Sequence, residues 1–499
     1  MGAALLVVFT AGNLFPLASF PPARVADLII RLTPGDLATF MIEKLGKGAI
    51  RSLGIGVTVA CLLSGGALGV LIGRARSTAG RARRALMAAL GVFLGSMLLA
   101  LGTPGAGSLT AALVYGVASI IFAKIAAEVP LLAAVEPKRV EDDETPLDAV
   151  MRSRRGFIMR MGLLIAGLVA GGGILRVLRS RNPKVAIAPA ARVFDPPPAD
   201  PVFPNVPGLA REITRNEDFY TVDINAFVKP TVDHSGWRLK IHGLVGAPYE
   251  LNFEQVQKDF EVVEMAHTLT CISNDVGGHL ISTAVWRGVR LKDVLERAQL
   301  REGTVDIVFR AAEGYSDSIP LEKAVEETTL LVFGMNGEAL PREHGFPARI
   351  IVPGIYGMKN VKWLTEIEAV DHDYQGYWMV RGWSDTARVK TASRFDTPQE
   401  GAHIPAGTML AGVAWAGDRG VRRVEVSDDK GVTWTPAVMK RELGPLTWRL
   451  WATELKAAKG PVRVMVRAVD GTGDIQGSRP AKPHPDGASG YHFLDLNVE

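Results

Sequence analysis

The chain has 499 residues, 47% of which are hydrophobic, with two cysteines and a formal net charge of only +4 at pH 7. At about 100–200 residues per domain, this length predicts about three units, and the near-neutral charge gives no reason to expect a nucleic-acid partner. Because the two cysteines, Cys61 and Cys271, lie far apart, a disulfide framework is excluded and a cysteine-rich zinc or iron–sulfur site is disfavoured.

The first 180 residues are dominated by Ala, Leu, Gly, Val and Ile, and all nine histidines come after position 233. The lack of histidine in the apolar part argues against a haem-carrying membrane domain. We predict a transmembrane anchor over residues 1–180 with about five helices, or about four as the alternative, and an interfacial helix at 25–45. The apolar stretches, each near the length that a membrane-spanning helix needs, are 2–20, 50–73, 86–102, 109–127 and 158–178.

The charges of the loops predict the orientation of this anchor. Arginines and lysines follow the second apolar stretch and precede the fifth, whereas residues 102–108 carry no positive charge. Positively charged loops stay in the cytoplasm. We therefore expect a multi-pass protein of the cytoplasmic membrane, in contact with membrane lipid, with residues 180–499 on the extracytoplasmic side.

The fifth apolar stretch begins with an arginine pair, Arg154-Arg155, followed by Gly156 and Phe157. This start is similar to a twin-arginine export signal, and ordinary cytoplasmic flanking charge is the alternative interpretation. Because that export route carries folded cargo, the motif predicts a cofactor-loaded domain beyond it.

Residues 181–210 are rich in proline, which predicts an extended, semi-rigid linker. A domain of mixed α and β pattern follows at 211–385. Period-two alternation predicts strands, and longer amphipathic segments predict helices. The expected strands are 237–242, 262–271, 305–311 and 349–352, and the expected helices are 253–259 and 289–298.

Five motifs in this domain share their order and spacing with a known family. They lie at 268–274, which contains Cys271, and at 286–295, 314–320, 344–349 and 353–364. Together they resemble the sulfite oxidase family of molybdopterin-dependent oxidoreductases, here of a membrane-anchored bacterial type. The resemblance covers about residues 216–499.

The resemblance implies that Cys271 is the metal ligand, its thiolate binding molybdenum beside the pterin dithiolene of a molybdenum–molybdopterin cofactor. A soft thiolate suits such a metal. A lone cysteine at a strand end is more often a small buried hydrophobic residue, but the surrounding motifs reverse that expectation. Tyr315 is the second expected catalytic residue, since relatives place a tyrosine next to the metal's oxygen ligand.

The same resemblance implies a set of cofactor-binding residues. Lys359 and Lys362 are spaced to hold one phosphate between them, with a solvated basic turn as the alternative. The whole expected set is Phe219, Tyr220, Cys271, Ser273, His344, Arg349, Gly357, Lys359, Val361 and Lys362.

The sequence departs from the family where relatives hold an anionic substrate with arginines. Asp223 and Asp275 stand at or near those positions, and a carboxylate there repels a dianion. The substrate is therefore left open between a sulfite-like anion and a small S- or N-oxide. The expected reaction is two-electron oxygen-atom transfer, with electrons exchanged through a separate cytochrome or quinone-linked partner.

From about residue 386 the pattern becomes rich in short strands, at 408–415, 421–427, 447–452 and 462–469. Short strands separated by Asp- and Gly-rich turns suggest a β-sandwich. Residues 386–499 resemble the family's immunoglobulin-like dimerisation domain, which leaves a homodimer as one of two open oligomeric states.

The predicted fold class is thus multi-domain, with N-terminal transmembrane α-helices, then an α+β molybdopterin-binding domain, then an immunoglobulin-like β-sandwich. The alternative function is a non-catalytic, membrane-anchored binding or assembly protein that retains the scaffold. The intact Cys271, His344, Arg349 and Lys362 count against it. A transporter is disfavoured by the few spans and the scarcity of charges within them.

Overall fold

A computed structural model describes residues 185–225 and 229–499, together with isolated positions between 29 and 87. The predicted membrane spans and the arginine pair lie almost wholly outside these described residues. Within them, no helix is both long and apolar enough to cross a membrane. The predicted fold class, which began with transmembrane helices, is therefore corrected: what the structure supports is two β-rich parts.

The first β-rich part contains two five-stranded sheets. In the first sheet β1 pairs in parallel with β10, and the other neighbours are antiparallel. The strand order of this sheet is β2 (Tyr249–Leu251), β1 (Leu239–Gly243), β10 (Leu364–Val370), β5 (Asp306–Ala311) and β6 (Ser316–Pro320). The second sheet is ordered β3 (Val262–Thr270), β4 (Ile281–Arg290), β7 (Leu330–Met335) and β8 (Glu338–Ala339), with β9 (Arg349–Ile351) also paired to β7.

The helices of this part are short: α8 (Phe253–Lys258), α9 (Leu291–Ala298) and α10 (Leu321–Ala324) have six, eight and four residues. The α+β assignment is therefore also corrected to a mostly β architecture. Both predicted helices are present. The first begins at a capping box between Asn252 and Gln255, and the second begins later than predicted because Val289 and Arg290 end β4.

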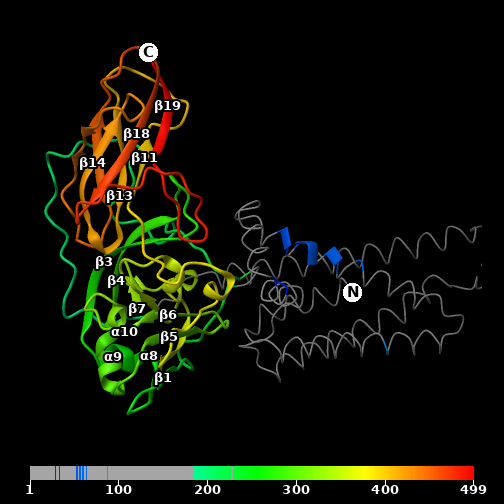
Figure 1. The fold of residues 1–499 in the computed structure, drawn as a ribbon. Coiled ribbons are helices and arrows are strands. Elements are labelled where there is room, and N and C mark those ends of the chain that lie inside the picture. The colour runs from blue at the N-terminus through cyan, green and yellow to red at the C-terminus, as the bar shows by residue number, and fades with distance from the viewer. Residues whose placement is uncertain are drawn as a thin grey trace, which may run out of the picture. The chain divides into compact units, whose positions relative to one another are not determined.

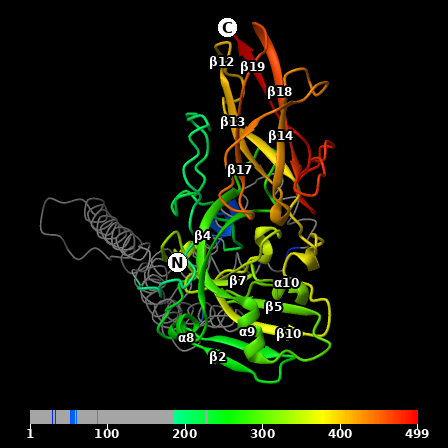
Figure 2. The same cartoon turned by 90° about the vertical axis from the view of Figure 1, so that its left-hand side faces the viewer.

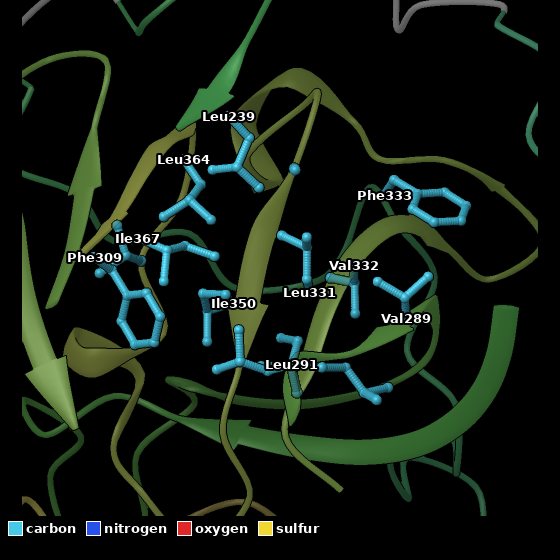
Figure 3. Packing of buried hydrophobic residues seen from close by; sticks show 14 of the residues in the cluster. Leu239, Val289, Leu291, Phe309, Leu331, Val332, Phe333, Ile350, Leu364 and Ile367 are labelled. Carbon is cyan, nitrogen blue, oxygen red and sulfur yellow. The ribbon is translucent and has the colours of Figure 1, made fainter. Parts of the chain in front are cut away.

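Side chains from both sheets meet in one hydrophobic core. Leu239, Phe309 and Ile367 come from the first sheet. Val289 and Leu331, with Val332 and Ile350, come from the second. All of these side chains are fully buried, and Figure 3 shows them packed together. Burying each such side chain contributes about 1.5–3 kcal/mol, so this cluster fixes the strand ends that carry the site.

The second β-rich part is built from a four-stranded and a five-stranded sheet that share a second core, which includes Phe395, Trp451, Val424 and Val464. Its strands lie together in both views (Figures 1 and 2). Each of the four strands predicted here is found, β14 with the predicted bounds. The sheets are ordered β11 (Ala392–Thr397), β13 (Met409–Trp415), β17 (Arg449–Glu454), β16 (Val438–Met439), and β12 (His403–Ile404), β19 (His492–Val498), β18 (Gly460–Asp470), β14 (Val421–Ser427), β15 (Thr435–Pro436).

Two buried histidines make the stability of this fold depend on pH. Burial lowers the pKa of His267 on β3 to about 3 and that of His492 on β19 to about 4, whereas a histidine in the unfolded chain titrates near about 6.5. Between these values the unfolded state binds more protons. The free energy of unfolding therefore falls with decreasing pH below about 6.5, by roughly 1.4 kcal/mol per pH unit for each histidine.

Urea denaturation at several pH values around and below about 6.5 measures this dependence. The variant His267→Leu should show a shallower loss of stability than the wild-type protein, since one of the two groups is removed. Equal slopes for the two proteins would contradict the assignment.

Candidate functional site

Cys271 is the first residue after β3, at the start of a tightly closed loop. Its backbone N–H donates to the carbonyl of Leu280 (2.9 Å), and its own carbonyl accepts from Asn274 (3.0 Å). The Asn274 side chain in turn accepts from the Leu280 N–H (2.7 Å). The loop of residues 271–280 is thereby tied at both ends, which fixes the backbone that carries the thiol.

The second β-rich part holds this cysteine loop at three points. Arg394 of β11 donates to the carbonyl of Gly278 (2.6 Å), and the Ser273 hydroxyl hydrogen-bonds the ring of His484 (2.9 Å). Gly277 has φ +75°, and a Cβ there would lie 2.4 Å from the His492 ring, so only glycine fits.

Two tyrosines lie near the thiol. Burial raises the pKa of Tyr220 well above its ordinary value, and the Cys271 charge adds to the shift. Burial also raises the pKa of Tyr356 to about 12, with Cys271 again contributing. A Cβ on Gly357 would lie 2.7 Å from the Tyr220 hydroxyl and 3.4 Å from the carbonyl of Thr270. The turn η2 (Gly357–Lys359) therefore packs directly beside the cysteine.

Arg349 is a buried guanidinium that no described carboxylate pairs with. It is 5% exposed and donates to the carbonyls of His344 and Asn360, both at 3.1 Å. Its Nε has no hydrogen-bond partner among the described residues. Burial lowers its pKa to about 10. A buried positive charge without a counter-ion creates strong attraction for an anionic group.

The predicted residues Phe219, His344 and Val361 lie in segments that contact Arg349 or its neighbours. The Trp286 ring lies 5.3 Å below the Arg349 guanidinium. Phe219 packs edge-on against Trp286 at 5.6 Å and against His344 at 5.3 Å, and the His344 ring also hydrogen-bonds the carbonyl of Asn216 (3.1 Å). Val361 takes part through its backbone, where its carbonyl accepts from Ile350 on β9 (2.9 Å). Phe219 thus packs between the Trp286 ring, on which Arg349 lies, and the ring of His344.

Tyr315 lies just before β6 and reaches the turn η2 from the other side. Its hydroxyl has two acceptors within hydrogen-bond distance, the carbonyl of Met358 (2.9 Å) and Oδ2 of Asp317 (3.1 Å), and its single proton can go to either of them. Burial raises its pKa well above the ordinary value, and the Asp317 charge adds to the rise. The phenol therefore stays protonated. The turn η2 connects it to the cysteine side of the site.

The two lysines do not form the predicted pair. The Nζ of Lys359 donates to Oδ1 of Asp317 (3.1 Å), to the carbonyl of Ser318 (2.9 Å) and to Asp385 (3.0 Å), which uses all three of its hydrogens. Lys362 instead binds Asp223 (3.3 Å). The two ammonium groups thus form two separate ion pairs, and their role in holding a cofactor phosphate stays a prediction.

Arg287, Arg290, Arg310 and Arg381 are the other arginines of this part that could attract an anionic substrate. The side chain of Arg381 lies 3.9 Å over the ring of Tyr377, which itself lies 5.6 Å from Tyr315, and donates to the carbonyl of Tyr377 (2.6 Å). The others form ion pairs: Arg287 with Glu264, Arg290 with Glu261 and Glu327, and Arg310 with Glu368.

An arc of aromatic rings joins Tyr315 to the cysteine loop. From Tyr377 it continues to Trp378 at 5.0 Å, to Trp383 at 4.0 Å and to His484 at 4.5 Å. Sequence reasoning missed Trp383, His484 and Asp385. Asp317 stood in a recognised motif without a role, although a carboxylate flanked by small and apolar residues on a strand was a usable signal.

A cavity of about 570 Å³ lies at the far end of β3, around Val263, Glu264 and Arg290. Its charged side chains are already paired with one another, as Arg290 and Lys292 are with Glu327. It therefore does not belong to the site at Cys271.

The residues around Cys271 fit the group that the sequence resemblance implied. A thiolate is a suitable ligand for a soft metal, and Arg349 offers an uncompensated positive charge to an anionic cofactor. Gly357 lets backbone and ring approach closely where a side chain would collide. The donor set thus matches a metal–pterin group.

Comparisons with known proteins point to one family. Residues 226–378 match the model "Oxidoreductase molybdopterin binding domain", and residues 385–482 match "Mo-co oxidoreductase dimerisation domain". The chain is 31% identical to sulfite oxidase of Gallus gallus over 53% of this chain and 68% of that protein. It is 30% identical to mitochondrial sulfite oxidase of Mus musculus over 59% of this chain and 66% of that protein. It therefore spans about two thirds of the length of these relatives.

The fold has a counterpart among solved structures. The sulfane dehydrogenase SoxCD from Paracoccus pantotrophus superposes with a TM-score of 0.52 at 22% identity, over 60% of this chain and 90% of that one. At this identity the likeness supports the fold alone. With the two family models and the chicken relative, the chain belongs to the sulfite oxidase family of molybdopterin-dependent oxidoreductases.

Proposed function

We propose that the protein catalyses two-electron oxygen-atom transfer on a small sulfur- or nitrogen-centred substrate. The family's cofactor is molybdenum–molybdopterin. The observation that carries the proposal is that the Cys271 thiol and the buried guanidinium of Arg349, which no described carboxylate pairs with, both interact electrostatically with Tyr220. A non-catalytic scaffold would have no need to keep that buried charge, which costs several kcal/mol.

Cys271 would hold the metal, and Arg349 with His344 would hold the anionic and polar parts of the pterin. When bound, the cofactor supplies the two-electron redox couple and the transferable oxygen. The protein's own residues position the substrate and move protons. Tyr315, whose phenol is kept protonated by burial and by the Asp317 charge, would be the proton donor.

The surroundings favour a substrate that carries an organic group. The aromatic arc from Tyr377 to His484 offers ring faces, which attract apolar or cationic groups more than anions. Asp223 is a carboxylate that pairs with Lys362, so it does not attract an anionic substrate. The positive charge of Arg381, which lies next to Tyr377, favours the anion sulfite as the second candidate.

The proposal is tested by metal analysis and a substrate screen. Protein produced in a host that makes the cofactor should contain about one molybdenum per chain, since one thiolate ligand is available. A screen of sulfite with an electron acceptor, and of sulfoxides and N-oxides with a reductant, should reveal turnover of at least one class. Protein without molybdenum from such a host would sink the enzyme proposal.

We also propose a separate electron-transfer partner, a cytochrome or a quinone-linked protein, and a homodimer, which the matched dimerisation-domain model supports. We also propose the extracytoplasmic location, which the Arg154-Arg155 pair and the positive charges around the apolar stretches support. A phosphatase reporter that is active only outside the cytoplasm, fused after Glu499, tests that location.

A further inference from the structure

Asp317 is a carboxylate with no exposed surface, held between a tyrosine and a lysine. Its Oδ2 accepts from the Tyr315 hydroxyl (3.1 Å), and its Oδ1 accepts from the Lys359 ammonium (3.1 Å). Each oxygen therefore faces a different titratable group. Burial raises the pKa of this carboxyl, which brings it closer to the pH at which proteins work.

Lys359 connects this carboxylate to the surface. The lysine side chain is only 3% exposed, but it also binds Asp385, whose side chain is 42% exposed. Asp385 in turn interacts electrostatically with Asp373, an exposed residue whose pKa is raised by partial burial and by the Asp385 charge. A continuous series of titratable groups thus runs from the Tyr315 phenol to solvent.

The packing around Asp317 closes the direct route to water. A Cβ on Gly376 would lie 2.9 Å from the Cα, Cγ and Oδ1 atoms of Asp317, so that segment lies directly on the carboxylate. Water therefore does not reach the Tyr315 hydroxyl from the side of Asp317. Exchange of protons on that side has to go through Lys359.

Oxygen-atom transfer needs such a connection. In the reducing direction the balanced reaction is XO + 2H⁺ + 2e⁻ → X + H₂O, with the electrons supplied by the reduced electron-transfer partner; in the oxidising direction the same two protons leave. A buried site must therefore exchange protons with solvent in every turnover.

We propose that Asp317, Lys359 and Asp385 form the proton path between Tyr315 and solvent. This inference rests on the proposed function. In the reducing direction the Tyr315 O–H bond breaks as its proton passes to the oxygen that leaves as water. Lys359 then gives a proton to the Asp317 carboxylate, Asp317 passes a proton on to the phenolate, and the Asp385–Asp373 pair restores the ammonium from solvent; a second pass delivers the second proton. The groups end each cycle in their starting states.

Other charged groups near this path are few. Glu313 and Tyr377 contribute to the electrostatic environment of Tyr315, and Asp306 to that of Asp373. Asp317 itself is hydrogen-bonded by Lys359, Tyr315 and the Ser318 N–H.

The test begins with Asp317→Asn, which keeps the shape of the side chain and cannot carry the proton. We expect kcat to fall about 100-fold or more, as for the loss of a general acid–base group, with KM little changed and a larger solvent deuterium isotope effect. The variant Asp385→Asn should lose less, and small weak acids added to the buffer should restore its rate. A merely structural role would show neither the isotope effect nor the rescue.

The matched control is Glu264→Gln, which breaks another buried ion pair of the same part, with Arg287, away from Tyr315. It should keep the wild-type kcat and isotope effect. A second readout needs no turnover: infrared spectra of cofactor-free protein should show a protonated carboxyl band that titrates above the ordinary range of aspartate and is absent in Asp317→Asn.

The outcomes separate the two proposals. A wild-type enzyme that turns over while Asp317→Asn keeps its kcat would overturn the proton path and leave the function standing. No turnover with any substrate would remove the function, while the infrared titration would still show whether Asp317 is the buried proton carrier. A wild-type spectrum without the band would count against the path.

Discussion

Replacing Cys271 by serine is expected to lower oxygen-atom transfer by more than about 100-fold, since even the loss of an outer partner of a metal ligand costs about 10–100-fold. A hydroxyl is a harder donor than a thiolate and stays protonated at neutral pH, so it binds a soft metal poorly. The fold should survive, because the loop is tied through the backbone of Cys271, Asn274 and Leu280 and not through the sulfur.

The measurement compares turnover, molybdenum content and thermal unfolding of Cys271→Ser with those of the wild-type protein. Cys61→Ser is the matched control, because it removes the other cysteine of the chain and should keep full activity. If Cys271→Ser retained more than a few per cent of the rate, another residue would have to be the ligand.

Replacing Arg349 by methionine should leave the purified protein nearly free of cofactor. Truncating one partner of a buried charge pair costs about 2–5 kcal/mol, which corresponds to a roughly 30- to 5,000-fold weaker affinity. The cofactor-free protein should lose little stability, because the removal of a desolvated charge offsets the two lost hydrogen bonds to His344 and Asn360.

Arg290→Met provides the comparison for this variant. Arg290 is also buried, but it pairs with Glu261 and Glu327, so its loss should destabilise the fold and spare the cofactor. Pterin fluorescence after denaturation and urea unfolding separate the two effects. Wild-type cofactor content in Arg349→Met would show that this guanidinium does not hold the cofactor.

The parts of this protein that sequence could predict are those set by local patterns. Alternation of apolar and polar residues placed β3 and β14, and the Asn252–Gln255 capping box marks where the first predicted helix begins. Cys271 was expected at a strand end, and it follows β3 directly. Each of these features depends on residues a few positions apart, which is the range that periodicity and capping describe.

The features that sequence missed depend on contacts between distant segments. Lys359 meets Asp317 from 42 residues away, and His484 meets Ser273 from 211 residues away. The spacing of Lys359 and Lys362 suggested a shared phosphate, but each found a carboxylate that no local pattern could assign to it. The transmembrane helices that the hydropathy pattern of residues 1–180 predicted as part of the fold class were also wrong. Among the described residues no helix is long and apolar enough to cross a membrane.

The three anchors on the cysteine loop, from Arg394, Ser273 with His484, and His492, have a consequence for engineering and for assembly. The two β-rich parts are not interchangeable modules: a chimera that takes its C-terminal half from a relative replaces the residues that hold the Cys271 loop in place. An association of two chains that shifts β11 or β19 should therefore also move the Cys271 loop.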